Sequence, residues 1–258
     1  MHILYEIYTY RTMIVSLIKR DIRGRYKGSV LGFAWTFLNP LLQLVVYTAV
    51  FSVIMRAGVE DYYLFLFVAL VPWIFFSSSL TGGASCIISQ QEMVKKIYFP
   101  REVLPISHVT SQLVNMLLSF VIIFGVLIIS GKGIYWGAVL YLPIVVIAEY
   151  VLAISIAMIS SAITVYFRDL EHILAVIALA WQFLTPIMYS IDMVPEQYRG
   201  IFNINPMTPI VKAYREIFYY KTIPQLDTLA HGFVLSIMLL IIGTIVFNIC
   251  KKHFAEEM

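Results

Sequence analysis

Six long runs that are nearly free of charge constrain this chain more than any other feature. Five of them contain no Asp, Glu, Lys or Arg: Gly28–Met55, Tyr62–Gln91, Val103–Gly131, Ile173–Ile191 and Thr228–Cys250. The sixth, Gly133–Phe167, is interrupted only by Glu149. A bilayer core requires about 20 apolar residues per helix, and a spanning segment must satisfy its own backbone hydrogen bonds. The sequence therefore predicts an all-α integral membrane protein with six transmembrane helices.

Composition agrees with a membrane protein and offers no sign of an enzyme. Hydrophobic residues make up 60% of the chain and charged residues 13%, whereas soluble domains carry about 25% charged residues. The two cysteines, Cys86 and Cys250, and the five histidines form no metal-binding pattern. The chain also lacks the ATP-binding P-loop and the common hydrolase motifs. We therefore expect no catalytic residue, no metal and no cofactor bound by this chain.

The distribution of basic residues predicts which way the chain faces. Six spans place both termini on one side, and twelve of the 18 Lys and Arg residues fall on that side: Arg11, Lys19, Arg20, Arg23, Arg25, Lys27, Lys95, Lys96, Arg101, Arg168, Lys251 and Lys252. The other six fall on the opposite side. Because basic residues accumulate on the cytoplasmic side of membrane proteins, we expect both termini to be cytoplasmic.

Residues 4–24, which precede the first span, read as an amphipathic helix. Its apolar face carries Leu4, Ile7, Ile14, Ile18 and Ile22, and its polar face carries Ser16, Lys19, Arg20, Arg23 and Lys27. Such a helix lies in the membrane interface and does not cross the bilayer. It would contact a partner protein or an anionic headgroup, or it would serve only as a topology anchor.

Residues 90–105 join the second and third spans on the predicted cytoplasmic side. Gln90–Ile97 could form two helical turns, and Pro100 should end them. We expect a short cytoplasmic helix followed by an exposed Tyr98-Phe99 pair, which would suit contact with another protein. The alternative is an ordinary basic loop.

Several local features refine the spans. Pro40 should kink the first span, and the pair Gly82-Gly83 should allow a close helix approach in the second. The aromatic residues of Ile134–Leu142 predict an interfacial segment before the fourth span. The apolar outer segment Asp192–Asp227 is punctuated by prolines. It predicts two short re-entrant helices that dip into the outer leaflet or line an exit.

Glu149 is the only acidic residue placed in the middle of a span. An ionisable residue inside the membrane is a functional candidate by default. Without a basic residue at matching depth, however, it would make a poor proton relay. A carboxylate bonded to neighbouring helices, or wetted by a lumen, is the alternative interpretation.

Seven sequence blocks, in order, resemble a known family. They lie at Arg20–Leu42 (RDIRGRYKGSVLGFAWTFLNPLL), Pro72–Ser77 (PWIFFS), Lys95–Ser107 (KKIYFPREVLPIS), Tyr166–Leu174 (YFRDLEHIL), Thr185–Ser190 (TPIMYS), Val194–Glu196 (VPE) and Asn205–Glu216 (NPMTPIVKAYRE). Together they resemble the membrane subunit of ABC-2-type exporters of polysaccharides and polyol phosphates, such as O-antigen and teichoic acid permeases. One mild departure is Gln90 or Gln91, where the family pattern leads us to expect Asn before the cytoplasmic helix.

The resemblance implies a single transmembrane domain over residues 1–258. Residues 1–27 would form the interface helix, 28–191 spans one to five, 192–227 an outer gate segment, and 228–258 the sixth span with a cytoplasmic tail. It implies a homodimer with two copies of a separate ATPase, which would bind ATP and Mg, in a bacterial or archaeal plasma membrane. The cargo would be a lipid-linked polysaccharide or teichoic-acid-like polymer, and no nucleic acid is expected.

The resemblance and the residue types together nominate three groups of functional residues. The helix between spans two and three is expected to couple to the ATPase through Gln91, Glu92, Lys95, Lys96, Phe99 and Arg101. Basic residues at the cytoplasmic mouth are expected to attract the phosphates of the lipid carrier: Arg23, Arg25 and Lys27. Aromatic side chains are expected to line the channel and stack on sugars: Trp35, Trp181 and Phe183.

Three alternatives stay open from the sequence. The first is an ABC-2 exporter of drugs or antibiotics, which would share the architecture. The second is a secondary transporter driven by protons through Glu149, although paired intramembrane charges and an internal repeat are not evident. The third is a membrane enzyme acting on lipid-linked sugars, although no cluster of acids or metal ligands supports it.

Overall fold

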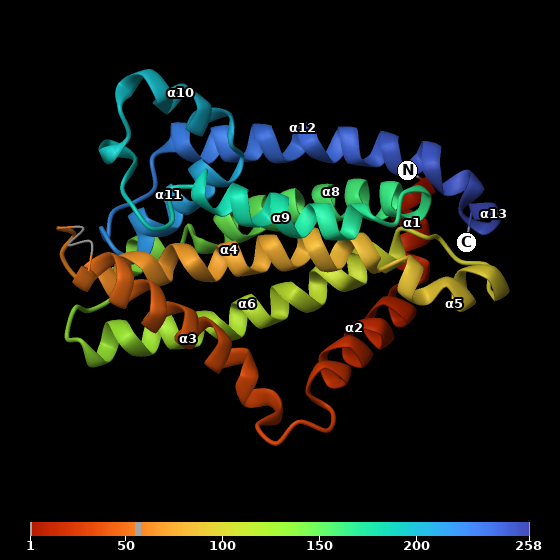
Figure 1. Ribbon diagram of the computed structural model, residues 1–258, viewed down its shortest axis with the longest axis horizontal. Coiled ribbons are helices and arrows are strands. Elements are labelled where there is room, and N and C mark those ends of the chain that lie inside the picture. Colours follow the sequence, from red (N-terminus) through yellow and green to blue (C-terminus); the bar gives the residue numbers. More distant parts are fainter. Residues whose placement is uncertain (1, 55–57, 258) are drawn as a thin grey trace.

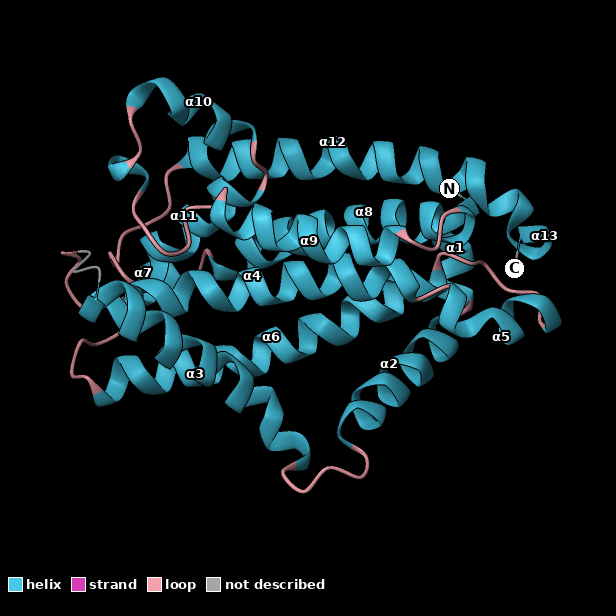
Figure 2. Ribbon diagram, in the orientation of Figure 1, coloured by secondary structure: helices cyan, strands magenta, loops and turns pink. Residues whose placement is uncertain are grey.

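The fold is a bundle of long helices that run side by side. The structure, a computed structural model, describes residues 2–54 and 58–257, without the side chains of residues 2–4, 25, 26, 53, 54 and 255. Within those ranges the regular elements are all helical, with no strand (Figure 2). Most long helices follow the longest axis of the molecule (Figure 1). The predicted all-α class is therefore confirmed for the described residues.

The helices follow one another without a strand or a long connection. In chain order they are α1 His2–Thr9, α2 Arg11–Tyr26, α3 Trp35–Thr48, α4 Tyr62–Ser85, α5 Gln91–Lys96, α6 Val103–Ile129, α7 Trp136–Val139, α8 Leu142–Tyr166, α9 Leu170–Phe183, α10 Glu196–Ile204, α11 Met207–Phe218, α12 Leu226–Cys250 and α13 Phe254–Glu257. Short 3-10 turns are η1 Gly32–Ala34, η3 Ile88–Gln90, η4 Ile191–Met193 and η5 Lys251–His253. A π-helical stretch, η2 Ala49–Ile54, extends α3.

Five helical segments of the described chain are long and apolar enough to cross a membrane: Gly32–Ser52, Tyr62–Ser85, Val103–Ile129, Trp136–Tyr166 and Leu226–His253. The sixth predicted run, Ile173–Ile191, differs from the expectation. It forms the 14-residue helix α9, which ends at Phe183. At 1.5 Å per residue this helix covers about 21 Å, less than the bilayer core of about 30 Å.

The end of α9 is set by the Thr185-Pro186 pair and its surroundings. Residues 184–187 form a turn, because proline cannot continue the hydrogen-bond ladder of a helix. Thr185 and Ile187 are fully buried. The side-chain amide of Asn205 donates to Leu184 O at 3.0 Å and to Thr185 Oγ1 at 2.9 Å. Residues 185–188 are buried, which is the condition under which a membrane tolerates non-helical backbone.

Helix α4 forms the centre of the bundle. Most of α4 is buried, whereas α3 and α12 expose most of their length, and α4 packs against α3, α6, α8, α9 and α11. A Cβ added at Gly83 would lie 2.9 Å from Ala157 Cβ of α8, and one added at Gly243 of α12 would lie 2.8 Å from Ser155 O. The prediction that Gly83 permits a close helix approach is therefore confirmed.

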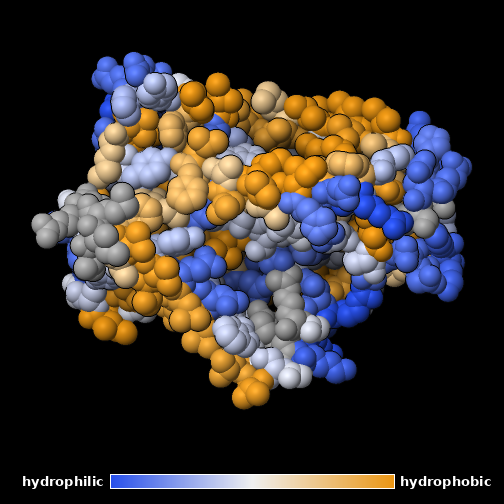
Figure 3. Space-filling model, in the orientation of Figure 1, coloured by the Kyte–Doolittle hydropathy of each residue, from blue (hydrophilic) through white to orange (hydrophobic). Residues whose placement is uncertain are grey.

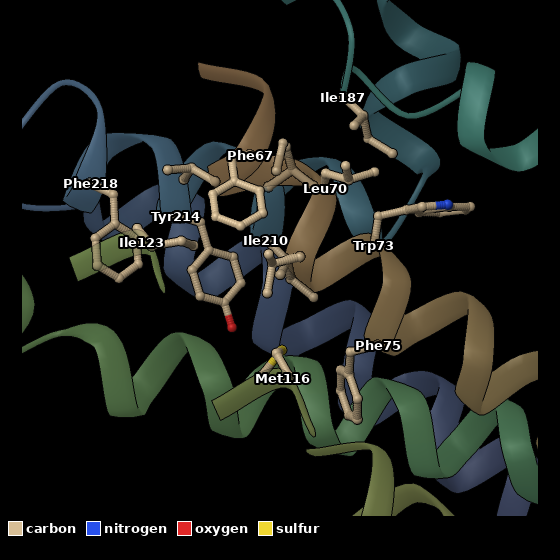
Figure 4. Close-up of a cluster of buried hydrophobic side chains, with 14 of the residues drawn as sticks. Phe67, Leu70, Trp73, Phe75, Met116, Ile123, Ile187, Ile210, Tyr214 and Phe218 are labelled. Carbon is tan, nitrogen blue, oxygen red and sulfur yellow. The ribbon is translucent and has the colours of Figure 1, made fainter. Parts of the chain in front are cut away.

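The main apolar cluster lies where α11 meets α4 and α6 (Figure 4). Phe120 of α6 packs on Tyr214 and on Phe218 of α11, with ring centroids 5.7 Å apart in both pairs. The predicted pair of short helices in Asp192–Asp227 is present as α10 and α11. They differ in environment, because nearly all of α11 is buried and no residue of α10 is.

The two ends of the bundle carry different elements. The N-terminus, the C-terminus, α5 and α13 lie at one end, and α10 and α11 lie at the other (Figure 1). The single N-terminal helix predicted over residues 4–24 is divided into α1 and α2, which meet at Tyr10. Helix α2 packs against α6 and diverges from α3, so that the two form a V (Figure 1).

Candidate functional site

A basic groove opens between α2 and the start of α3. It has a volume of about 840 Å³ and is lined by Ser16, Lys19, Arg20, Arg23, Gly24, Lys27, Gly32 and Phe33. Figure 3 shows this side of the molecule hollowed between α2 and α3, with hydrophilic side chains around the hollow. Four cations beside an aromatic ring suit an amphiphile whose headgroup carries phosphate.

The groove contains most of the residues predicted to meet the headgroup. Arg23 and Lys27 both line it, whereas the side chain of Arg25 lies outside the described part of the chain. Sequence reasoning did not assign Lys19 and Arg20 to this site. Their position on the polar face of α2, one helical turn before Arg23, is the signal that would have found them.

Helix α5 projects from the bundle at the end that holds both termini (Figure 1). Val94 anchors it in a second apolar cluster, while Lys95 and Lys96 are exposed. Lys96 pairs with Glu92 at 2.5 Å one turn away, and both side chains are more than 70% exposed. An exposed pair of this kind contributes little stability, so these charges are free to serve a surface role.

The predicted exposed pair Tyr98-Phe99 is wrong in its second member. Tyr98 is 86% exposed, but Phe99 is only 2% exposed and packs in the cluster that includes Val94 and Phe254. An aromatic ring between two apolar neighbours gains more from burial than from exposure to solvent. Phe99 therefore fixes the base of α5 and does not offer a surface. Arg101 is half-buried, and its Nε has no hydrogen-bond partner among the described residues.

The three predicted channel aromatics do not share one site. Trp35 lines a cavity between α3, α4 and α6, and Trp181 and Phe183 are not among its lining residues. The Trp181 indole donates to Asn205 Oδ1 at 2.9 Å and packs edge-to-face on Phe76. Phe183 is half-exposed at the end of α9. Of the three, Trp35 alone borders a polar space described here.

Glu149 is fully buried in α8. Its carboxylate accepts a hydrogen bond of 2.6 Å from the hydroxyl of Tyr214 in α11. The other carboxylate oxygen has no hydrogen-bond partner among the described residues. This arrangement favours the interpretation of a carboxylate bonded to a neighbouring helix.

Arg215, next to Tyr214, was not singled out by the sequence. Its guanidinium lies 3.5 Å from the centroid of the Phe65 ring and donates to the carbonyls of Ile187 at 2.7 Å and Tyr189 at 3.4 Å. Burial lowers the pKa of Arg215 to about 9. Electrostatic attraction to nearby tyrosines, most strongly Tyr220, raises the pKa and so limits this decrease. The group stays protonated at neutral pH and satisfies the carbonyls that follow the end of α9. The sequence carries little signal for this role, because α11 also contains Lys212 and Glu216.

The C-terminal tail is joined to the segment that follows α5. Lys251 pairs with Glu102 at 2.5 Å, and Glu102 is almost fully buried. Tyr166, at the end of α8, donates to Cys250 O at 2.7 Å. Phe254 is buried against Phe247. In the part of the chain that the structure describes, no group of His, Cys, Asp or Glu could hold a metal ion.

The fold and these sites define a multi-pass helical membrane protein with an apolar bundle, a basic groove and a short exposed helix at one end. The sequence model of the family described as "ABC-2 type transporter" matches residues 12–219. The chain belongs to this family.

Curated relatives extend the match over nearly the whole chain. An O-antigen export system permease protein RfbA of Myxococcus xanthus is 36% identical over 254 residues, covering 98% of this chain and 97% of the relative. A protein of the same name from Klebsiella pneumoniae is 32% identical, covering 95% and 94%. The polysialic acid transport protein KpsM of Escherichia coli is 24% identical, covering 92% and 93%.

Proposed function

We propose that this chain is the permease subunit of an ATP-driven ABC exporter that moves a lipid-linked polysaccharide from the cytoplasm across the plasma membrane. The observation that carries the proposal is the near end-to-end similarity to O-antigen export permeases at 30–36% identity. The polysialic acid relative widens the comparison to a second polysaccharide system. The family resemblance of the sequence also allows a teichoic-acid-like polymer as the cargo.

In this proposal the chain crosses the membrane six times and has both termini in the cytoplasm. An odd number of crossings, such as the five candidate spans alone, would place the two termini on opposite sides of the membrane. Both termini, however, lie at the same end of the bundle (Figure 1). Termini at one end favour an even number of crossings, and in this proposal α9 together with the turn at residues 184–187 would form the sixth. The excess of Lys and Arg at the end that holds α1, α2, α5 and α13 supports a cytoplasmic position for that end. The helices α10 and α11 then form the outer gate segment.

Energy would come from a partner. The chain carries no P-loop, so ATP and Mg would be bound by two copies of a separate ATPase, each facing one subunit of a permease homodimer. Exposed Glu92, Lys95, Lys96 and Tyr98 offer the contact surface, together with Gln91. Buried Phe99 and half-buried Arg101 would pass the motion of α5 into the bundle, because both lie at its base.

The basic groove between α2 and α3 would receive the cargo. Its cations, including Arg23 and Lys27, would bind the phosphates of a polyprenyl-type carrier, and Phe33 would contact the lipid chain. Each basic residue near an anionic membrane surface gains about 1 kcal/mol. The headgroup would thus be concentrated beside the first span before transport begins.

Reconstitution tests this proposal directly. The permease and the ATPase encoded next to it in the genome, purified together and placed in proteoliposomes, should move a short lipid-linked glycan in an ATP-dependent way. A variant ATPase that binds but does not hydrolyse ATP is the control and should abolish transport. Transport by the permease without the ATPase would contradict the proposal and favour a proton-driven transporter. Transport of a drug-like amphiphile in place of the glycan would favour the drug-exporter alternative.

A further inference from the structure

One face of α6 carries a polar stripe inside the membrane. His108, Gln112, Asn115 and Ser119 follow one another at spacings of four, three and four residues, so their side chains lie on the same side of the helix. Gln112 is only 7% exposed and Ser119 is buried as well. Amide and hydroxyl groups are rare at membrane depth because hydrocarbon does not satisfy their hydrogen bonds. His108 lies within hydrogen-bond distance of Ser78 O and of Gln112, and Ser119 donates to Asn115 O. The buried Asn115 Oδ1 has no hydrogen-bond partner among the described residues and requires a polar neighbour.

The neighbour is a cavity. A space of about 140 Å³ lies between α3, α4 and α6, and its walls are polar at Thr36, Asn39, Ser78, Gln112, Asn115 and Ser119. Trp35 lies at the same wall. One buried water needs about 10–15 Å³ of such space, so the cavity exceeds the room for a single structural water roughly tenfold. It is too large to be only a packing defect filled by one water.

A second polar cavity lies next to this space, towards the end of the bundle that holds both termini. It measures about 240 Å³ between α2, α4 and α6, and Arg20, Asp21, Ser85, Ser89 and His108 are among its lining residues. His108 Nε2 lies 3.5 Å from Gln112 Nε2, which belongs to the first cavity. Arg20 also lines the basic groove. Polar side chains thus lead from the basic groove to the middle of the bundle.

The chemistry of the wall changes along this path. The basic groove and the second cavity hold charged side chains, whereas the lining of the 140 Å³ cavity contains no Asp, Glu, Lys or Arg. Its side-chain amides each donate and accept hydrogen bonds, and the indole of Trp35 offers an apolar face. Uncharged donors and acceptors beside an aromatic ring fit a neutral, hydroxyl-rich molecule better than a phosphate or a metal ion.

We propose that the cavity lined by Asn39, Gln112 and Asn115 is a binding subsite for uncharged sugar units, entered from the basic groove that holds the carrier phosphates. This inference rests on the proposed function and makes it specific. The phosphates stay at the cations of α2, and the first sugars reach the amides of α3 and α6. In this arrangement the sugar hydroxyls replace water as the hydrogen-bond partners of the amides.

The experiment uses the complete permease–ATPase complex in proteoliposomes, with a short lipid-linked glycan as the probe. ATPase activity is measured against the glycan concentration for wild type, Gln112→Leu and Asn115→Leu. Loss of one hydrogen bond should raise the half-maximal concentration about fivefold per variant. Asn248→Leu, which makes the same change on α12 away from the cavity, is the matched control and should keep the wild-type value.

Thiol labelling keeps the proposal falsifiable if the leucine variants fail to assemble. In a background without Cys86 and Cys250, Asn115→Cys should react with a polar thiol reagent, and the glycan should slow that reaction. Lys252→Cys, exposed at the C-terminal end of the chain, is the control: it should react with the same reagent, and the glycan should not slow that reaction. Unchanged half-maximal concentrations, or labelling of Asn115→Cys that the glycan does not slow, would overturn the subsite while leaving ATP-driven export intact. A wild-type complex that ignores the glycan would overturn the proposed function as well.

Discussion

Tyr214 of α11 donates a hydrogen bond of 2.6 Å to the carboxylate of Glu149 in α8. Both side chains are completely buried. The one acid in the middle of a span is therefore tied to the short helix of the outer segment. The bond joins two parts of the chain that are separated by 65 residues, and it holds α11 in the apolar cluster shown in Figure 4.

We expect Tyr214→Phe to destabilise the permease without changing its cargo. The variant removes the donor and leaves a buried carboxylate unpaired, which costs about 1–3 kcal/mol. Thermal unfolding of the purified subunit in detergent, compared with wild type, measures this loss. A variant as stable as wild type would show that the bond contributes nothing to the position of α11.

Glu149→Gln separates a structural acid from a proton carrier. The glutamine side chain keeps an oxygen that accepts from Tyr214, so ATP-dependent transport should stay near the wild-type rate. A proton-driven transporter would lose transport altogether, because an amide cannot exchange the proton. Transport rates in proteoliposomes, measured with and without a proton gradient, decide between the two.

Arg215→Met tests how the non-helical end of α9 is stabilised. The variant leaves the carbonyls of Ile187 and Tyr189 without the guanidinium that they bind. We expect a loss of about 3 kcal/mol, because hydrogen bonds to charged groups contribute more than neutral ones. Arg199→Met is the matched control, since Arg199 donates only to carbonyls of its own surface loop. It should unfold within a few degrees of wild type, and equal losses in both variants would contradict the role of Arg215.

The sequence predicted the elements of this fold better than their contacts. Charge-free runs are long enough to locate spans, and Pro100 and the basic pair of α5 defined a short helix between two of them. Where α9 stops depended on tertiary contacts. Its run of apolar residues continues to Ile191, but Asn205 and Arg215 supply hydrogen bonds that make a turn at residues 184–187 stable.

The dependence on tertiary contacts also explains which site residues could be predicted from the sequence. Arg23 lies on α2 and Lys27 directly follows the end of that helix, so residue type and closeness in the sequence were enough to group them. Phe99 was placed wrongly because it is buried in a cluster that gathers residues far apart in the chain, Leu17 and Phe254 among them, and no local pattern reports such neighbours. The cavity between α3, α4 and α6 combines residues from three helices. Its polar members are unremarkable one by one, and only packing brings them to one space.

Charge reversal on α5 tests the proposed contact with the ATPase. In Lys95→Glu/Lys96→Glu the exposed cations become acids, and we expect weaker association with the ATPase and a loss of transport-coupled ATP hydrolysis. Stability should change by less than about 0.5 kcal/mol, because surface substitutions rarely cost more. Lys252→Glu at the exposed C-terminal end is the control. Normal association and normal export by the α5 variant would remove this surface from consideration.

Neutralising the basic groove should impair export while leaving the complex assembled. Arg23→Ala/Arg25→Ala removes two cations at the proposed cytoplasmic surface, each worth about 1 kcal/mol towards an anionic headgroup. The apparent affinity for lipid-linked glycan should therefore fall, and raised salt should narrow the difference from wild type. Arg168→Ala, on the turn between α8 and α9, controls for general loss of positive charge. Unchanged export in the double variant would contradict a headgroup role for α2.

The ion pair between Lys251 and Glu102 connects the C-terminal tail to the segment that follows α5. Its removal should destabilise both segments. Lys251→Met leaves the buried Glu102 carboxylate without its partner, which costs about 3–5 kcal/mol. Glu102→Met alone leaves the lysine, which is partly exposed and can turn to water, so its loss should be smaller. Replacing both residues by Met should recover most of the stability, because a buried pair and an apolar pair are often nearly equal in free energy. Thermal unfolding of the three variants gives the coupling free energy between the two side chains. Additive losses in the double variant would show that the two side chains do not act as a pair, and the tail would then have no part in positioning α5.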